Sequence, residues 1–544
     1  MASRELSQGD PFVGSPDWWL GVLVRGLLER LPLFEERGAY VEGRQAYPYM
    51  DRRYWKSYGH LQALCATNYC GLVTNAAVQR MEIRGFQFEE GGALDDEART
   101  IWSNNDMDMQ STTINAWAAK YGVAYALVEP PEEDDPNQLP CITALDPRTT
   151  MIYRNPKKPT EALAALRMWN DDLDGHTLAV LYLPDAIYGY RGPQIANLSG
   201  IALIEIQNRL LGINGGPGGF SRVESVPNEL GRVPIVEFVW RPETGLLPEP
   251  EAGLDVRTIQ DRVNQTVFDR VAISQTQSYK QRWVSGISPS TNKQGHAKAP
   301  FDAGWDTLWT TEAVDAKFGE FSSADITQIL DAIRDDISDI AAITQTPSHY
   351  LMGKVANVSG ETLALAETGL VKKIKQRMKS MGWSYEVLMR LAFAYGGDQA
   401  KATAPYGTVI WIDPEQNALT DQAAAAAQFI SSGIPVNITM ERVGGFSEEQ
   451  IADAQAQADL QAQQDMEMQQ QQMQMAADQQ QHQQGMDKTG QQLDAKKQQQ
   501  DHQVATIQAQ ASLKKASAGN PRTASNGGGN PRPKKSSLKK KPTK

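Results

Sequence analysis

Two long helical segments, each with one apolar stripe, bracket an irregular insertion, and this pattern constrains the fold more than any other feature of the chain. From Leu254 to Tyr279, apolar residues recur every three or four positions, which predicts one apolar face on a helix of about seven turns. A second striped segment runs from Ile326 to Ile340. The residues between them, 283–321, contain Gly, Pro and Trp and no stripe. We therefore expect a two-helix stalk that carries a small head. The stripe residues are Val256, Ile259, Val263, Val267 and Val271 in the first segment and Ile326, Leu330, Ile333, Ile337 and Ile340 in the second.

The second helix also carries acidic residues on the side opposite its stripe. We place five aspartates on this face: Asp325, Asp331, Asp335, Asp336 and Asp339. Asp331, Asp335 and Asp339 repeat every four residues, as expected of one helical face. Such a run usually forms a solvated surface. The sequence predicts an acidic face along the outside of the stalk.

The remainder of the first 460 residues predicts an α+β protein of more than one domain. A chain of 544 residues is longer than the roughly 250–300 at which one hydrophobic core stops growing. Residues 16–80 have helical spacing and are rich in aromatic side chains, and a helix is expected over 109–121. Short strand-like runs separated by turn residues predict a mainly antiparallel module. The strands of this module are expected at 151–153, 178–183, 201–206 and 235–239, and two earlier strands are expected at 83–88 and 123–128.

Beyond the stalk, Pro347 predicts the end of the second helix, and residues 348–360 predict a Gly-containing loop. A long helix is then expected from Glu361 to about Tyr395. A strand over 408–412 and Ala-rich or short helices up to residue 460 complete the part expected to be ordered.

The last 84 residues differ from the rest in composition and in charge. Of the 24 residues from Gln461 to Gln484, 13 are Gln, with no apolar stripe. The segment is expected to be a disordered tail, with a helical extension or weak self-association as alternatives. The final 31 residues carry ten basic side chains and no acid, whereas residues 1–513 carry 43 basic and 65 acidic ones. The basic residues are Lys514, Lys515, Arg522, Arg532, Lys534, Lys535, Lys539, Lys540, Lys541 and Lys544.

The sequence contains no constellation that predicts catalysis or a cofactor. A phosphate-binding loop is missing, because the Gly-rich run 215–219 is followed by Phe-Ser-Arg instead of Gly-Lys-Ser/Thr. Six histidines and three cysteines lack the spacing of metal ligands, and the cysteines Cys65, Cys70 and Cys141 are expected to be reduced and buried. No apolar run is long enough to span a membrane, and the N-terminus lacks the order of a signal peptide. We expect no enzyme, no cofactor, no metal and no membrane partner.

The order of these parts resembles the portal proteins (head-to-tail connectors) of long-tailed double-stranded DNA bacteriophages. The most telling stretch is residues 343–353, Ile-Thr-Gln-Thr-Pro-Ser-His-Tyr-Leu-Met-Gly, followed by 357–363, Asn-Val-Ser-Gly-Glu-Thr-Leu. It looks like that family's junction between stem, tunnel loop and wing helix. The early helix 68–75, the strand 83–88 and the run Ile101 to Asn105 support the resemblance.

The resemblance implies a ring, probably of 12 subunits, around a DNA channel at the unique vertex of the capsid. Residues 1–253 and the helix 361–397 would form the wing, 254–280 and 325–345 the stem, and 281–324 the clip. Residues 346–360 would form the tunnel loop, 398–460 the crown and 461–544 the disordered tail. The protein would be made in the host cytoplasm and then built into the virion.

The resemblance also assigns roles to residues and names partners. Tyr350, Lys354, Asn357 and Ser359 would contact passing DNA without reading its sequence, and the acidic stem face would line the channel. Trp283, Trp305 and Trp309 of the clip would meet the large terminase subunit and later the head–tail adaptor. The remaining partners would be other copies of the chain, the major capsid protein and a scaffold, with the basic tail facing the head interior.

Two other classes remain open at this point. A different virion protein, such as a minor head protein or an adaptor, would also lack catalytic motifs. An enzyme with a helical regulatory domain would need a pocket of converging titratable groups.

Overall fold

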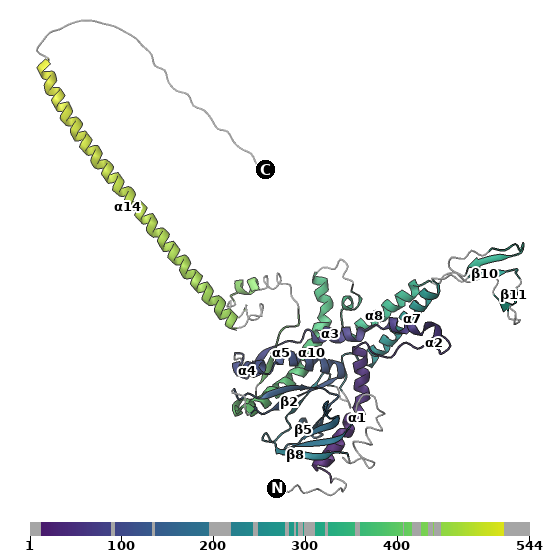
Figure 1. Ribbon diagram of the computed structural model, residues 1–544. Coiled ribbons are helices and arrows are strands. Elements are labelled where there is room, and N and C mark those ends of the chain that lie inside the picture. The colour runs from purple at the N-terminus through teal and green to yellow at the C-terminus, as the bar shows by residue number, and fades with distance from the viewer. Residues whose placement is uncertain are drawn as a thin grey trace. The chain divides into compact units, whose positions relative to one another are not determined.

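The computed structural model divides the chain into two units, residues 1–416 and 417–544, which are described separately. The structure describes residues 12–88, 93–132, 137–194, 219–242, 248–277, 282–287, 290–291, 297–298, 310–320, 325–353, 360–405, 407–415, 426–433, 439 and 448–515. The first unit combines helices with antiparallel sheets (Figure 1), which agrees with the predicted α+β class.

Helix α1 (Pro16–Val41) opens the described chain and covers one sheet. It begins at Ser15, whose hydroxyl accepts a hydrogen bond from the Trp18 backbone N–H at 3.2 Å, and Pro16 occupies the first turn, where no backbone donor is needed. Its apolar face, from Leu20 to Leu31, packs on strands β4 to β7. After α1 follow α2 (Trp55–Gln62), the short 3-10 helix η1 (Ala63–Cys65) and α3 (Tyr69–Val78).

The sheet under α1 has five antiparallel strands in sequential order. They are β4 (Thr150–Asn155), β5 (Lys158–Asn170), β6 (His176–Tyr182), β7 (Ala186–Gln194) and β8 (Ser221–Pro227). The predicted strands at 151–153 and 178–183 lie within β4 and β6. The sequence did not predict β5, β7 or β8, because β5 begins with four exposed residues, β7 contains glycines and a proline, and β8 is exposed throughout. The run predicted at 201–206 lies outside the described residues.

A second, three-stranded sheet forms the centre of the first unit. Strand β2 (Val123–Glu129) lies between β3 (Cys141–Leu145) and β9 (Ile235–Val239), and six consecutive β2 residues are buried. Helices α4 (Asp96–Asn104) and α5 (Met107–Tyr121) precede it. The predictions for 109–121, 123–128 and 235–239 are confirmed.

Helix α10 (Gly360–Gly396) passes through the main core, where Tyr385 is fully buried. The Tyr385 ring lies 4.7 Å from Phe238 and 6.0 Å from both Trp102 and Trp411, between ring centroids. After α11 (Gln399–Ala402), strand β14 (Thr408–Trp411) pairs with β1 (Ile83–Gln87). Residues 408–411 therefore belong to the α+β body, although the sequence placed them with the segment 398–460.

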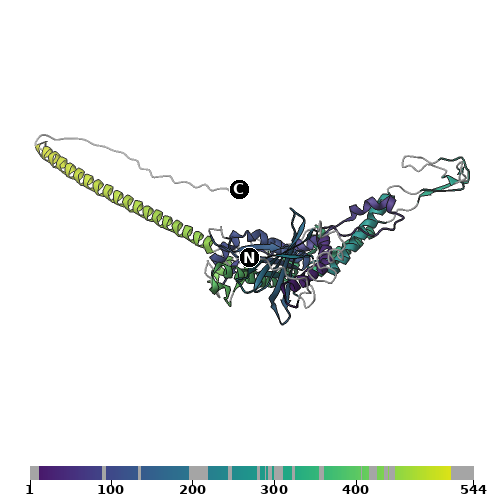
Figure 2. The ribbon, with the colours of Figure 1, turned by 60° about the horizontal axis from the view of Figure 1, so that its bottom comes forward.

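Helices α7 (Leu254–Gln277) and α8 (Thr327–Thr344) form the predicted stalk, which we call the hairpin. They run side by side away from the sheets, and the strand pairs β10–β13 (Arg282–Ser285 with Lys317–Glu320) and β11–β12 (Ser290–Thr291 with Ala297–Lys298) join them (Figures 1 and 2). Val263 and Ile340, one from each stripe, are completely buried. Both helical predictions are confirmed.

The apolar stripes of the hairpin are covered by the same chain. The α7 stripe packs on Ile333, Ile337 and Ile340 of α8 and on residues of α2, η1 and α3. This arrangement corrects one step of the argument from sequence, which assumed that each stripe would pack against a neighbouring copy in a ring. The exposed outer faces of the hairpin, and not its stripes, are the surfaces left for other molecules.

In the second unit, α14 (Glu448–Lys515) is a single helix of 68 residues. At 1.5 Å per residue it is about 100 Å long. It runs across the boundary that the sequence placed at 460/461, and residues 461–515 adopt the helical extension instead of the irregular tail first expected. Residues 426–431 of this unit are also helical, within the Ala-rich helix predicted before Ser432.

Candidate functional site

The junction between the hairpin and α10 is the first part of the candidate site. Helix α8 ends at Thr344, where Gln345 adopts a left-handed conformation with φ of 52°. A five-residue helix, α9 (Ser348–Met352), follows and ends at Gly353, whose φ of 64° favours glycine. The loop predicted from Ser348 therefore begins with a helical turn, which Pro347 directly precedes.

Tyr350 of α9 is held by an ion pair between two distant elements. The guanidinium of Arg80, just after α3, donates to the Tyr350 hydroxyl at 2.6 Å and to Glu367 of α10 at 2.9 Å. The Tyr350 hydroxyl in turn donates to Glu367 at 3.2 Å, and His349 stacks on the Tyr350 ring with 4.7 Å between centroids. The Arg80 and Glu367 side chains are only 7% and 15% exposed. Tyr350, predicted as a contact to DNA, is thus also an anchor for α9.

The predicted tunnel-loop residues Lys354, Asn357 and Ser359 lie outside the described residues. Their flanks are described: Gly353 ends α9 and Gly360 begins α10. Arg80, two residues after α3, contacts both Tyr350 of α9 and Glu367 of α10 and so links the two flanks.

The acidic face of α8 is exposed, as expected, and it also carries arginines. Asp331 pairs with Arg334 at 2.9 Å, and Asp339 lies 3.4 Å from Arg262 of α7. Asp335 is exposed on the same face. Asp336 is nearly buried and accepts a hydrogen bond from Arg262 at 2.7 Å, so it holds α8 to α7 instead of facing water. Three aspartates therefore contribute charge to this face, and arginines partly offset it.

Trp283 of the predicted clip lies on strand β10, opposite Gly319 of β13. Its ring covers Gly319 so closely that an added Cβ would come within 2.4 Å of it, and the side chain is 40% exposed. Trp305 and Trp309 lie outside the described residues.

The base of the hairpin contains a buried ion pair that the sequence analysis did not single out. The Lys373 ammonium of α10 lies 2.6 Å from the carboxylate of Glu251 and 2.5 Å from the backbone carbonyl of Thr344. The Lys373 and Glu251 side chains are 8% and 3% exposed. Burial works against ionisation of Glu251, but the charge and hydrogen bond of Lys373, the Trp240 indole N–H and the charge of Arg377 outweigh it and lower the pKa of Glu251.

One sequence signal could have revealed this pair. Leu370, Ile374 and Met378 are buried on one face of α10, and Lys373 and Arg377 lie on the same side at a spacing of four. A charged residue on a buried helical face needs an opposite charge, because an unpaired buried charge is strongly unfavourable.

Gly122, just after α5, allows the backbone at Pro248 to pack closely against the end of α5. Its φ is 92°, and an added Cβ would lie 2.2 Å from the carbonyl oxygen of Pro248. The buried guanidinium of Arg37 donates to that carbonyl at 2.9 Å and to the carbonyl of Tyr121. The segment leading into α7 is therefore packed directly on the end of α5.

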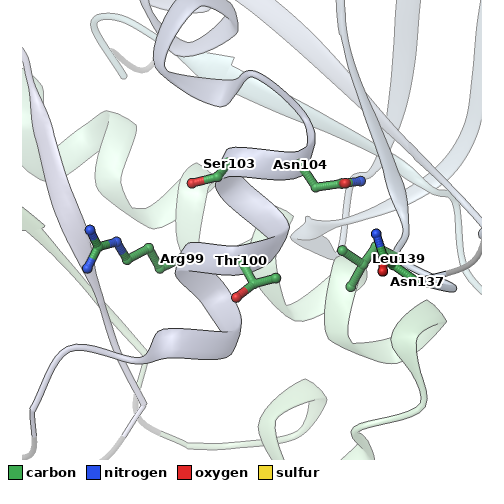
Figure 3. A pocket seen from close by; sticks show the side chains of 6 residues that line it. All are labelled: Arg99, Thr100, Ser103, Asn104, Asn137 and Leu139. Carbon is green, nitrogen blue, oxygen red and sulfur yellow. The ribbon is translucent and has the colours of Figure 1, made fainter.

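One surface hollow of the described residues lies beside α4, and its side chains form no catalytic arrangement. This hollow of about 700 Å³ is lined by Arg99, Thr100, Ser103, Asn104, Asn137 and Leu139. Figure 3 shows that Arg99 points away from Asn137 and Leu139, so these side chains do not converge. Within the described ranges, no group of three or more His, Cys, Asp or Glu side chains is placed to hold a metal ion. Of the helices described, none is both long and apolar enough to cross a membrane.

The cysteines and the basic tail complete the comparison with the sequence predictions. Cys65 and Cys70 are buried thiols and Cys141 is half-buried. Burial raises the pKa of Cys70 to about 12, so this thiol stays protonated. Lys514 and Lys515 end α14, whereas the other basic residues of the tail lie outside the described part of the chain.

The α+β body, the out-and-back hairpin and the junction leading into a long core helix are the parts that the resemblance to phage portal proteins implied. Comparison with known families agrees: residues 23–470 match the family described as "Phage portal protein, SPP1 Gp6-like". The chain belongs to this family. Members are structural, non-enzymatic components of the virion and sit at the capsid vertex.

Two portal proteins of mycobacteriophages are among its relatives. The portal protein of Mycobacterium phage D29 is 24% identical over 426 residues, which cover 74% of this chain and 82% of the relative. The portal protein of Mycobacterium phage L5 is 24% identical over 387 residues, which cover 68% and 74%.

Proposed function

We propose that this chain forms the portal ring of a phage capsid, through which the genome enters during packaging and leaves during ejection. The observation that carries the proposal is the hairpin, a pair of long helices that leaves the α+β body and returns to it beside the junction with α10. Copies arranged around an axis with their hairpins side by side would enclose an aqueous channel. Heterologous contacts form a ring when the rotation from one copy to the next closes after a full turn.

In this proposal the parts of the subunit take the roles expected of the family. Residues 1–253 and 361–397 form the wing, α7 and α8 the stem, and residues 281–324 the clip. Residues 346–360 form the tunnel loop, and the crown follows the body, starting later than the predicted residue 398 because β14 pairs with β1. Twelve subunits would complete the ring.

The exposed face of α8 would line the channel and keep friction with DNA low. Asp331, Asp335 and Asp339 repel phosphates, whereas a lysine-rich wall would bind them tightly. Arg262 and Arg334 moderate this repulsion. Lys354, Asn357 and Ser359 would then make transient contacts to the DNA backbone, next to the anchored Tyr350.

The partners in this proposal are those of a packaging vertex. The clip, including Trp283, Trp305 and Trp309, would dock the large terminase subunit during packaging and the head–tail adaptor afterwards. The wing would contact the major capsid protein. The basic residues of the tail, from Lys514 onward, would contact packaged DNA or a scaffold in the head interior. Catalysis by the chain itself has no part in this scheme.

Electron microscopy of the purified full-length protein tests the ring. The expected result is closed rings with a central hole, from which the subunit number is counted directly. A compact monomer without an opening would contradict the proposal. It would favour the alternatives of a minor head protein or adaptor, or of an enzyme with a helical regulatory domain.

The acidic lining has a separate test in virions assembled with variant chains. The triple variant Asp331→Asn/Asp335→Asn/Asp339→Asn should slow DNA passage, seen as less DNA packaged per head in a fixed time and a stronger dependence on salt. A control with Glu29→Gln, Glu35→Gln and Asp172→Asn removes three exposed carboxylates outside the hairpin. Equal DNA content in both variants would rule out the lining role.

Removal of residues 514–544 tests the tail. Reduced DNA content or defective head assembly is expected if the basic residues contact the genome or a scaffold. Unchanged assembly and DNA content would reduce the tail to a solubilising terminus.

A further inference from the structure

We propose that Lys373 is the positioning residue that fixes the direction in which the hairpin leaves the body, because its ammonium group bridges the two feet of the hairpin. The feet are the residues at which the hairpin joins the body: Glu251, three residues before α7, and Thr344, the last residue of α8. Lys373 belongs to neither helix of the hairpin and reaches both feet from α10.

The first foot is tied to the central sheet and its helix. The backbone N–H of Glu251 donates to the carbonyl of Ala119, near the end of α5, at 2.8 Å. Its carboxylate accepts a hydrogen bond from the buried Trp240 indole at 2.8 Å. One oxygen of the carboxylate thus accepts a hydrogen bond from Trp240, and the other accepts one from Lys373 at 2.6 Å.

The second foot offers Lys373 a helix end. Helix C-termini carry partial negative charge on carbonyls that have no partner within the helix. Lys373 donates to one of these carbonyls, that of Thr344, at 2.5 Å. The ammonium therefore lies between a carboxylate and the negative end of α8, and both interactions are buried. Neither is weakened by solvent as a surface pair would be.

The contacts at the base of the hairpin affect its direction as well as its stability, because apolar contacts and buried hydrogen bonds differ in how strictly they fix geometry. The stripes of α7 and α8 hold the hairpin together by apolar contacts, which are non-directional and tolerate small rotations. Buried hydrogen bonds to a charged group depend on distance and angle, and they fix one arrangement. Directional contacts also hold α7, since Gln260 and Asn264, both buried, accept hydrogen bonds from the backbone N–H groups of Tyr69 at 2.7 Å and Thr67 at 3.0 Å. Loss of the Lys373 bridge should therefore release mainly the end of α8, and this widens the range of hairpin directions while the stripes remain packed.

The consequence for the ring rests on the proposed function. Helix α10 begins immediately after residues 354–359, and Lys373 lies on its N-terminal half. A displacement of α10 caused by passing DNA would be transmitted through Lys373 to both feet, and hence to the hairpin. The positioning role itself requires neither DNA nor a ring.

Double electron–electron resonance measures the distribution of distances between two spin labels, and this distribution reports how far the direction of the hairpin varies. Labels are attached to Met109→Cys on α5 and Gln328→Cys in the first turn of α8, both exposed positions, in a Cys141→Ser background. Cys65 and Cys70 are buried and stay unlabelled. Labelled chains are mixed with an excess of unlabelled ones, so that only distances within one subunit are measured whether or not rings form.

The test variant is Lys373→Met/Glu251→Gln, which removes both charges and keeps an acceptor for Trp240. We expect the distribution of distances to broaden at least twofold. The control, Arg154→Met/Glu237→Gln, removes an ion pair of 2.5 Å between β4 and β9, away from the hairpin, and should leave the width unchanged. An unchanged width in the test variant, or equal broadening in the control, overturns the inference.

A second variant covers the case in which the double variant does not fold. Glu251→Asp shortens the carboxylate arm by one methylene and keeps both charges, so a smaller broadening in the same direction is expected. An unchanged width here also overturns the inference. Rings without broadening contradict the positioning role alone, whereas broadening in a protein that forms no rings contradicts the proposed function alone.

Discussion

The hairpin and α14 are both long helical structures, but different interactions stabilise them. Helices α7 and α8 each present an apolar stripe that is buried against the other helix and against α2, η1 and α3. Among the α14 side chains that the structure describes, the larger apolar ones are exposed, for example Met466 and Met468, which point to different sides. The hairpin is held by tertiary packing, whereas α14 depends on the helix propensity of Gln, Ala and Met.

This difference predicts how far the effect of a substitution on stability extends from its site. In the hairpin, one side chain affects several elements, because it contributes to a core shared with the body. In α14, a substitution should act only on the neighbouring turns. Four predictions, ordered by expected size, test this contrast.

The largest effect is expected at the base of the hairpin. Lys373→Met alone leaves Glu251 buried without its main partner, and breaking a buried pair in this way lowers the free energy of unfolding by about 3–5 kcal/mol. Chemical denaturation followed by tryptophan fluorescence measures this loss. The double variant with Glu251→Gln should recover most of it, and no recovery would show that the lysine stem, and not its charge, is what matters.

A cavity in the stripe should have the next largest effect. Ile340→Ala removes a fully buried side chain, with a loss of roughly 2–4 kcal/mol and a lower Tm in calorimetry. The matched substitution in α14 is Leu493→Ala, at a side chain that is 64% exposed, where a change below about 0.5 kcal/mol is expected. Similar losses at both positions would contradict the contrast.

A helix breaker in α14 should act locally. Gln471→Gly lowers helix stability by roughly 1 kcal/mol at an exposed position. Far-UV circular dichroism should report reduced helicity, and proteolysis near residue 471 should become faster. The denaturation midpoint of the first unit should stay unchanged, so a shift of that midpoint would indicate that α14 supports the body.

The smallest effect is a dependence on pH at the hairpin base. The folded-state pKa of Glu251 is lowered from 4.5, so its contribution to stability is complete above that pH and is lost as pH falls through the folded-state value. The difference in stability between wild type and Lys373→Met/Glu251→Gln should therefore shrink on acidification below about pH 4.5. A difference independent of pH between 6 and 3 would mean that the carboxylate is not ionised in the fold.

The helices of the hairpin could be predicted because their periodicity is strong and long. Spacing also placed β4, β6 and β9 correctly. Spacing does not show which partner covers an apolar face. For this reason the stripes were assigned to a neighbouring copy, whereas Val263, Ile333 and Ile337 share one core within the same chain. Strand β8 was missed for a related reason, since an exposed strand shows no alternation of buried and polar residues.

At the candidate site, the sequence predicted the exposed acidic face of α8, whereas the DNA contact predicted for Tyr350 stays a prediction, and the groups that hold these residues were not predicted. Arg80 lies 287 residues from Glu367, and Glu251 lies 122 residues from Lys373. Pairings over such separations depend on the fold and leave no local pattern. The only local sign was the presence of Lys373 and Arg377 on the buried side of α10.

The close packing of Gly122 on Pro248 has a consequence for how such a chain can change over generations. Any side chain at position 122 would displace the backbone segment that contains Pro248 and Glu251, and the distance from the Glu251 carboxylate to Lys373 would increase. A single extra methyl group at the end of α5 would thus tilt a projection that begins six residues after Pro248. Many surface positions of the α+β body can change without this cost, but position 122 has to remain glycine for the hairpin to keep its direction.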